Sequence, residues 1–393
     1  MQLSCRNEGQ VGQLRRDGSG RAHQLSTTLK QTFVGRRDAS TKSHHKWGAK
    51  MAHDLSRDAD GNVEMMYVGE EMPWHKLGTK LKIPPATAEE AIKAARLGWR
   101  VLKKQLYVGE DHRPLPGEYA IVREDRWERK EDGAIFGTVK HDYQTLQNTE
   151  AFTFFDPIIE AGAARYETAG ALGRGERVWV QVLVKGRQQV VPGDEIAKYL
   201  LLSNSHDGKG AVHVKFTPVR VVCRNTLNQA MERGPTLRVA HTLSMKDRLK
   251  DVGQAIKQIN DRFDDLGASF RRLAAINMNT QRLDEYLQIV FPEPKRVSDD
   301  RAYTRAKRQM QEDQTAAKAL FKSGKGNEIE GVAETLWAAY NGVTEYVDFY
   351  KYKTGDGKWL ETIWFGAGDA IKTRAFDAAL TIAQAHNQPI VTA

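Results

Sequence analysis

"AKYLLLSNSHDGKGAVHVKFTPV" (residues 197–219) contains two runs of mainly apolar residues, separated by a short polar segment. Asp207 and Gly208 occupy that segment, and Asp-Gly is a pair that favours tight turns between strands. Two such runs around such a turn are typical of paired antiparallel strands. The stretch therefore predicts a β-hairpin at the centre of the chain.

The residues on either side extend this hairpin into a sheet. Upstream, "RYETAGALGRGERVWVQVLVKG" (residues 165–186) predicts a second hairpin around Gly173, Arg174 and Gly175. Downstream, "KFTPVRVVCRNTLNQAMERG" (residues 215–234) is predicted to begin as a strand. No glycine or proline interrupts it between Val221 and Met231, which predicts that the strand passes into a helix. The centre is predicted to be an antiparallel β-meander followed by a helix.

Three more strands and two helices are predicted before this centre. Residues 87–99 predict a helix, because Thr87 can cap its first turn and Glu90 follows three residues later. A second helix is predicted at residues 149–161. The strands are predicted at residues 99–108, 118–125 and 134–139, which are rich in β-branched and aromatic residues.

Beyond residue 244 the apolar residues follow a helical spacing. They recur every three or four positions, as in the seam of a coiled coil. One row comprises Leu249, Val252, Ile256, Ile259, Phe263, Leu266, Phe270 and Leu273, and a second comprises Ile329, Val332, Leu336, Val343, Val347 and Tyr350. Two long antiparallel helices that pack on each other within one chain explain the rows, and a seam between subunits is the alternative.

These patterns together predict an α+β fold with three parts. Residues 1–50 are expected to form a disordered basic extension, residues 51–240 an α+β core domain around the central antiparallel meander, and residues 241–393 a mostly helical C-terminal region.

The positive charge is concentrated in the first fifty residues. The whole chain has a formal net charge of +9, and residues 1–50 hold ten basic against three acidic residues, a net +7. Only +2 remains for residues 51–393. The segment could be a basic arm for nucleic acid, a targeting peptide or an upstream extension outside the working protein. We favour the extension, because the apolar run of a targeting peptide is missing and "MAHDLSRD" from Met51 reads as a natural start.

Cysteine content and hydropathy indicate a reducing, aqueous setting. Cys5 and Cys223 are the only cysteines, too few for a disulfide framework. No run of eighteen apolar residues occurs, so no membrane-spanning segment is predicted. These features predict a cytoplasmic protein with no membrane partner.

A hydrolytic enzyme, such as a nuclease, is one alternative for the function. Cys223 lies near Arg220 and Arg224, which would lower the pKa of its thiol and favour a nucleophilic role beside a histidine. The available histidines are His75, His141 and His206. The residues around Cys223 are apolar, however, and free cysteine is among the most buried residue types, so a buried thiol is favoured.

Motifs for metals, cofactors and phosphates are missing from the sequence. The chain has no HExxH or CxxC motif and no cluster of carboxylates, so neither a metal nor a cofactor is predicted. Gly170, Gly173 and Gly175 fall between two predicted strands, which does not fit a dinucleotide-binding loop. "SGKGN" (residues 323–327) lacks the residue order of a phosphate-binding loop and predicts a flexible joint.

Basic residues gather in the centre of the chain. Residues 203–240 hold six Lys and Arg against two acidic residues, and residues 165–187 hold five against two. Trp179, Tyr199 and Phe216 lie on the same predicted strands. A basic groove with aromatic faces suits single-stranded nucleic acid, because cations meet phosphates and rings stack on unpaired bases. The alternative is that the aromatic residues point inward and the arginines are ordinary solvated groups.

Four motifs carry a resemblance to a known family. They are "PWHKLGT" (residues 73–79), "DYQTLQNTEAF" (142–152), "TAGALGRGERVWV" (168–180) and "FTPVRVVCRNTLNQA" (216–230). With these motifs in this order, the chain from about Met51 to Ala393 resembles the phage/plasmid-like protein family, a domain of unknown function of bacteriophages and mobile elements. The resemblance implies a mobile-element setting and supplies neither a reaction nor catalytic residues. The predicted order of meander and helices is also similar to ring-forming single-strand annealing proteins, an architectural analogy that implies an oligomer with a basic groove and no nucleotide cofactor.

The leading hypothesis is a homo-oligomer that binds single-stranded DNA and assists strand annealing or recombination of a phage or mobile element. The residues expected to bind are Lys215, Arg220 and Arg224 at phosphates, Arg174 and Arg177 along the same groove, and Trp179 stacked on bases, together with Lys209. Besides the hydrolase, an oligomeric scaffold or host-interaction protein built on the helical rows is the other alternative.

Overall fold

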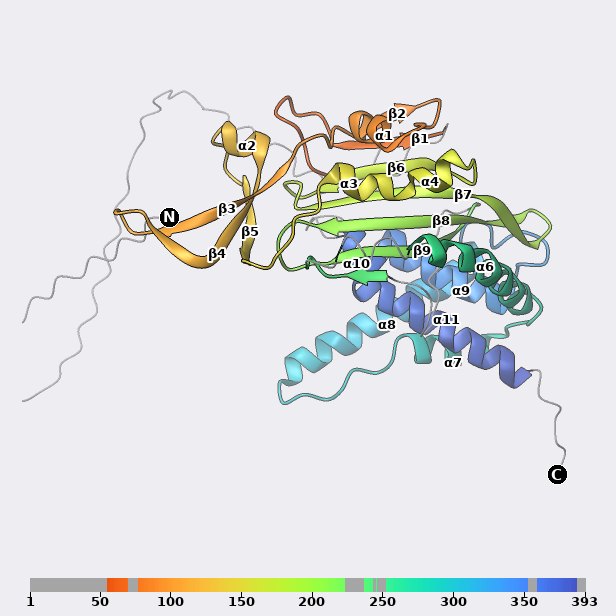
Figure 1. Cartoon of the computed structure of the whole chain (residues 1–393). Coiled ribbons are helices and arrows are strands. Elements are labelled where there is room, and N and C mark those ends of the chain that lie inside the picture. Colours follow the sequence, from red (N-terminus) through yellow and green to blue (C-terminus); the bar gives the residue numbers. More distant parts are fainter. Residues whose placement is uncertain are drawn as a thin grey trace, which may run out of the picture. The chain divides into compact units, whose positions relative to one another are not determined.

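The computed structural model describes residues 55–69, 77–222, 237–242, 245, 252–352 and 359–386. Residues 49–393 form one compact unit (Figure 1). The expected α+β class is confirmed, with antiparallel-rich sheets followed by a helical C-terminal part. The extension at residues 1–50 and the helix expected beyond residue 226 lie outside the described residues, and the expected boundary near residue 240 stays a prediction.

A seven-stranded sheet forms the centre of the unit, with the strand order β10-β9-β8-β7-β6-β1-β2. Its strands are β1 (Met65–Val68), β2 (Thr79–Leu81), β6 (Ala164–Leu172), β7 (Arg177–Val191), β8 (Asp194–Ser205), β9 (Val212–Arg220) and β10 (Leu237–Val239). All neighbours are antiparallel except β1 and β2. The predicted turn between β8 and β9 forms because the Asp207 carboxylate accepts hydrogen bonds from the N–H groups of Lys209 and Gly210, at 2.8 and 3.2 Å.

A three-stranded sheet, β3-β4-β5, lies beside the first one (Figure 1). It consists of β3 (Val101–Val108), β4 (Arg113–Arg123) and β5 (Ile135–Lys140), and the short helix α2 (Glu124–Glu128) follows β4. The Arg123 side chain, at the end of β4, is buried, and its Nη1 donates to the Glu64 carboxylate at 2.9 Å. Because Glu64 directly precedes β1, this buried ion pair joins the two sheets.

Short helices cover the β6 part of the large sheet. They are α1 (Ala88–Ala95), α3 (Asn148–Phe152), the 3-10 turn η1 (Thr153–Phe155) and α4 (Asp156–Glu160). The Thr87 hydroxyl accepts a hydrogen bond from the Glu90 N–H at 3.3 Å, which confirms the expected cap. The Tyr166 hydroxyl of β6 donates to the Asp156 carboxylate at 2.8 Å and so holds α4 on the sheet.

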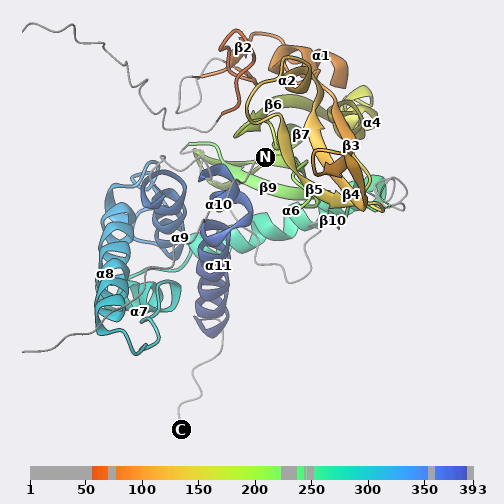
Figure 2. The ribbon, with the colours of Figure 1, turned by 90° about the vertical axis from the view of Figure 1, so that its left-hand side faces the viewer.

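The C-terminal helices are α6 (Val252–Ala274), α7 (Thr280–Val290), α8 (Asp300–Ser323), α9 (Leu336–Glu345), the π-helical segment η2 (Tyr346–Lys351), α10 (Trp359–Phe365) and α11 (Ala367–His386). The first apolar row lies on α6 from Val252 onward, and Leu249 lies outside the described residues. The helix α6 extends from the other helices along the sheet (Figure 2). Its Phe270 ring packs 4.6 Å from the Trp337 ring of α9. The second row is not one long helix, because Ile329 and Val332 lie in turns before α9.

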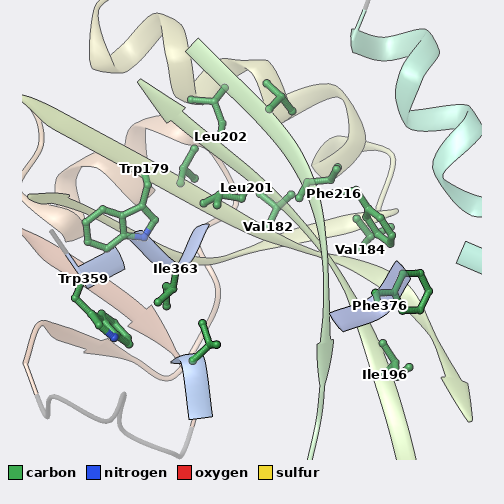
Figure 3. Packing of buried hydrophobic residues seen from close by; sticks show 14 of the residues in the cluster. Trp179, Val182, Val184, Ile196, Leu201, Leu202, Phe216, Trp359, Ile363 and Phe376 are labelled. Carbon is green, nitrogen blue, oxygen red and sulfur yellow. The ribbon is translucent and has the colours of Figure 1, made fainter. Parts of the chain in front are cut away.

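One apolar core joins the sheet to the helices. Figure 3 shows Trp179 and Leu201 of the sheet beside Trp359 and Ile363 of α10, and Phe376 belongs to the same buried cluster. In the part of the chain that the structure describes, no helix is both long and apolar enough to cross a membrane.

Candidate nucleic-acid interface

Arg220 is a buried structural anchor, which corrects its expected role at a phosphate. The side chain is fully buried at the end of β9, and its Nε and Nη2 donate to the Asp194 carboxylate at 2.8 Å each. Nη1 donates to the Asn327 amide oxygen at 3.0 Å, and the Trp337 indole donates to Asp194 at 2.8 Å. The arginine therefore ties β8 and β9 to the loop before α9.

Lys215 and Trp179 also differ from expectation, because the C-terminal helices cover them. The Lys215 ammonium group pairs with the Asp369 carboxylate and donates to the Trp364 carbonyl at 3.0 Å. Burial lowers the pKa of Lys215, and Asp369 opposes that shift. Trp179 is 2% exposed, so its ring is not available to stack on a base. Arg224 lies outside the described residues.

Arg174, Arg177 and Lys209 meet at one end of the large sheet. Arg174 is exposed in the β6–β7 turn, Arg177 is half-buried at the start of β7, and Lys209 is exposed in the β8–β9 turn. A Cβ atom added at Gly210 would lie 3.7 Å from Nη2 of Arg177, so this arginine lies against the β8–β9 turn. Three of the six expected residues that the structure describes are therefore accessible, and they lie at the end of the strands opposite to Arg220.

The cross-strand register shows which side chains share a face with Trp179. Trp179 pairs with Ser203, and Ser203 pairs with His213. His213 pairs in turn with Arg238 of β10, which is exposed. Paired residues lie on the same face of a sheet, and Arg177 shares that face because it precedes Trp179 by two positions.

His213 lies among three cations on this face. Burial lowers the pKa of its imidazole, and Arg238, Arg177 and Lys215 lower it further. The ring is therefore neutral at pH 7, and its Nδ1 is buried with no hydrogen-bond partner among the described residues. A positive potential that acts on this histidine will also attract an anion.

Two half-buried aromatic residues of α10 lie beside these cations. The Phe365 ring is 5.1 Å from the His213 ring, with an angle of 39° between the two planes. The Trp364 ring packs edge-on against Trp179 at 6.0 Å. We name this set the basic–aromatic corner, and it comprises Arg177, His213, Arg238, Trp364 and Phe365.

The corner falls within a region that matches a protein family. The family model of a domain of unknown function, DUF932, matches residues 135–375, more than half of the chain. The chain belongs to this family. The DUF932 region contains the meander, the corner and most of the C-terminal helices, whereas β3 and β4 precede it. No curated protein and no solved structure matches the chain.

Sequence reasoning missed three members of the corner in the DUF932 region. His213 lies on the predicted hairpin, but only the observed register, which is centred on Gly208, places it opposite Ser203; a turn centred between Asp207 and Gly208 would place Val212 there. No local sequence pattern places Trp364 and Phe365 beside the sheet. The hydrogen bond from Lys215 to the Trp364 carbonyl joins residues that are 149 positions apart. Arg238 was counted among the basic residues of the region 203–240 but was not expected to bind.

His206 is a core residue of the DUF932 region. It is fully buried, with ring centroids 5.7 Å from Trp99 and 6.1 Å from Phe136, and its Nε2 lies 3.0 Å from the Asn148 amide oxygen. Burial lowers the pKa of His206 to about 3, so the ring is neutral at pH 7. No group of three or more His, Cys, Asp and Glu side chains that could hold a metal ion occurs among the described residues. Cys223 and His75 lie outside them.

Proposed function

We propose that this DUF932 chain binds single-stranded DNA at the basic–aromatic corner. The observation that carries the proposal is the position of His213, whose ring packs on Phe365 and lies among Arg177, Arg238 and Lys215. Cations beside accessible rings are the arrangement that single strands require.

The residues of the corner divide into two roles. Arg177 and Arg238 supply charge for phosphates. Arg177 also helps to lower the pKa of the Asp207 carboxylate, and Lys215 holds a carboxylate of α11. Phe365 and Trp364 supply rings on which bases stack. A duplex hides the faces of its bases, so single strands are preferred.

Arg174 and Lys209 extend the charge along the same end of the sheet. Both are exposed, and each lies in a turn that joins two long strands. A strand that crosses the corner can run past both turns, which lengthens the phosphate path without a further aromatic contact.

The proposal includes a role in strand annealing or recombination of a phage or mobile element, carried out in the cytoplasm by a homo-oligomer. The resemblance to phage/plasmid-like proteins and the analogy with ring-forming annealing proteins support this wider role.

Fluorescence anisotropy of a labelled oligonucleotide, titrated with the full chain over a salt series, tests the proposal. Residues 1–50 carry a net +7, so differences between variants decide the outcome rather than binding alone. Arg177→Ala with Arg238→Ala should weaken binding and reduce the slope of log affinity against log salt by about 1.4, since each single-strand phosphate contact contributes about 0.7. Phe365→Ala should cost about 1–3 kcal/mol of binding free energy and leave the slope unchanged.

Arg308→Ala on α8 is the matched control, because that side chain is 81% exposed. Affinity for a duplex and for RNA of the same sequence measures the preference for single-stranded DNA. If the double variant binds as the control does, the corner is not the interface. Cleavage of the oligonucleotide during the titration would favour the hydrolase instead.

A further inference from the structure

The C-terminal end of α10, which carries two rings of the basic–aromatic corner, is held on the large sheet by a lysine of β9. Nζ of Lys215 donates to the Trp364 carbonyl at 3.0 Å and pairs with the Asp369 carboxylate in the first turn of α11. The same nitrogen lies 6.0 Å from the centroid of the Phe365 ring. Lys215 therefore contacts the chain on both sides of Phe365.

The polar contact at this end of α10 has a physical reason. Trp359 and Ile363 of the helix are buried in the core, whereas Trp364 and Phe365 are half-buried. The last four carbonyl groups of an α-helix have no partner within the helix, and the Trp364 carbonyl is one of them. A cation at the C-terminus of a helix is stabilising. The Lys215 ammonium group therefore fixes the end of the helix that apolar packing leaves half exposed.

A second lysine–aspartate pair joins α11 to the π-helical segment η2. Nζ of Lys372 donates to the Asp348 carboxylate at 2.7 Å, and both side chains are buried. Lys372 follows Asp369 by three positions, so the two side chains lie on one face of α11. Apart from burial, which lowers the pKa of Lys215, and Asp369, which raises it, both members of this second pair act on it, so the two pairs form one cluster. We name the cluster the lysine–aspartate clamp, and it comprises Lys215, Asp369, Lys372 and Asp348.

We propose that the lysine–aspartate clamp positions the rings of Trp364 and Phe365 for the bases of single-stranded DNA. This inference rests on the function proposed for the corner. Arg177 and Arg238 lie on strands and the rings lie on α10, so the distance between a bound phosphate and a stacked base depends on how α10 is positioned on the sheet. Binding groups keep their geometry only when neighbouring contacts fix them, and the clamp supplies such contacts. Lys215 therefore acts through the rings, without a phosphate contact of its own.

Two variants that change the charge in opposite directions test the clamp. Asp369→Ala removes a negative charge and Lys215→Met removes a positive one, and each breaks the same ion pair in the full chain. In fluorescence anisotropy with a labelled single-stranded oligonucleotide, both variants should bind about tenfold more weakly, which is the size of one lost base stack. The slope of log affinity against log salt should stay as in the wild type, because no phosphate contact is lost.

A role through charge alone gives a different pattern. Asp369→Ala would then strengthen binding, and Lys215→Met would reduce the salt slope by about 0.7, the contribution of one phosphate contact. Either result overturns the proposal. Circular dichroism verifies that each variant folds, and the direction of the change in Asp369→Ala decides if Lys215→Met does not fold.

Lys351→Met is the matched control for the loss of a buried ion pair. Lys351 is 13% exposed, close to the 14% of Lys215, and it pairs with Asp313 of α8, outside the corner. This variant should bind the oligonucleotide as the wild type does. Weakening equal to that of Lys215→Met would show that a loss of stability, and not of ring position, lowers the affinity, and would overturn the proposal.

A chain with Trp364→Ala and Phe365→Ala separates this inference from the proposed function. Asp369→Ala added to that chain should not weaken binding further, because no ring is left to position, and a further tenfold loss overturns the clamp. If Phe365→Ala alone binds as the wild type does, the function proposed for the corner fails as well. A loss in Phe365→Ala with no loss in Asp369→Ala overturns the clamp alone.

Discussion

Arginines at the two ends of the strands β7 to β10 are in opposite states. At one end Arg220 is fully buried and bonded to Asp194 and Asn327. At the other end Arg238 is exposed and Arg177 half-buried, beside a neutral histidine. In the sequence Arg220 and Arg238 belong to the basic region at residues 203–240 and Arg177 to the one at residues 165–187, and nothing there distinguishes a buried arginine from an exposed one.

The difference shows that the residues packed around the end of a strand decide whether an arginine there is buried in an ion pair or accessible to a ligand. The Arg220 end meets the loop before α9, which contributes Asn327 and the Gly326 carbonyl. At the opposite end the β8–β9 turn packs against β5, since a Cβ atom added at Gly208 would lie 2.5 Å from a Val139 side-chain carbon, and α10 packs on His213. A buried arginine needs a carboxylate to offset the cost of its desolvation, whereas an exposed arginine can attract an anion from outside.

Removal of the buried arginine should have the largest effect. Arg220→Met leaves the Asp194 carboxylate buried without its cationic partner, with only the Trp337 indole still donating to it, and the free energy of unfolding should fall by about 3–5 kcal/mol. Arg238→Met at the open end is the control and should change it by less than about 0.5 kcal/mol. Urea denaturation measures both, and equal losses would show that the two ends do not differ as described.

Lowering the pH should destabilise the fold through His206, which is buried just before the β8–β9 turn. Its pKa is about 3 in the folded chain against 6.5 for an ordinary histidine. Between these values the unfolded state binds more protons, so stability falls as pH decreases below 6.5, by about 1.4 kcal/mol per pH unit.

From pH 7 to pH 5 this contribution amounts to about 2 kcal/mol. Urea denaturation of the wild type and of His206→Gln at both pH values isolates it, because other histidines act equally in both proteins. The variant should lose less stability than the wild type on acidification. An equal loss of stability in the wild type and in His206→Gln would show that His206 is not the group that makes stability depend on pH.

The smallest effect is expected at an exposed lysine of the open end. Lys209→Ala should change the free energy of unfolding by less than about 0.5 kcal/mol. It should reduce the salt slope of oligonucleotide binding by about 0.7, the contribution of one phosphate contact. Lys295→Ala, on the exposed α7–α8 connection, is the control and should leave the slope unchanged. If Lys209→Ala leaves the salt slope of oligonucleotide binding unchanged, Lys209 is not part of the interface, which is then limited to the basic–aromatic corner.

The fold was predictable wherever the deciding interactions are local. The Asp207–Gly208 turn and the Thr87 cap formed as expected, because each depends on residues only a few positions apart. The second apolar row was misjudged as one helix, because the turns around Ile329 and Val332 interrupt its helical spacing. The candidate site was predictable only in Arg174, Arg177 and Lys209.

The sequence by itself determined the strands of the meander and of the small sheet, their turns and the α+β class, because alternation and turn residues act over short distances. The strands β1, β2 and β10 were not predicted. Only the tertiary structure decided which charges are accessible. Arg220 is separated from Asn327 by 107 positions and Lys215 from Asp369 by 154, and no local pattern encodes such pairs. Burial is a property of what packs over a residue, so the function of a basic residue follows from contacts that the sequence does not display.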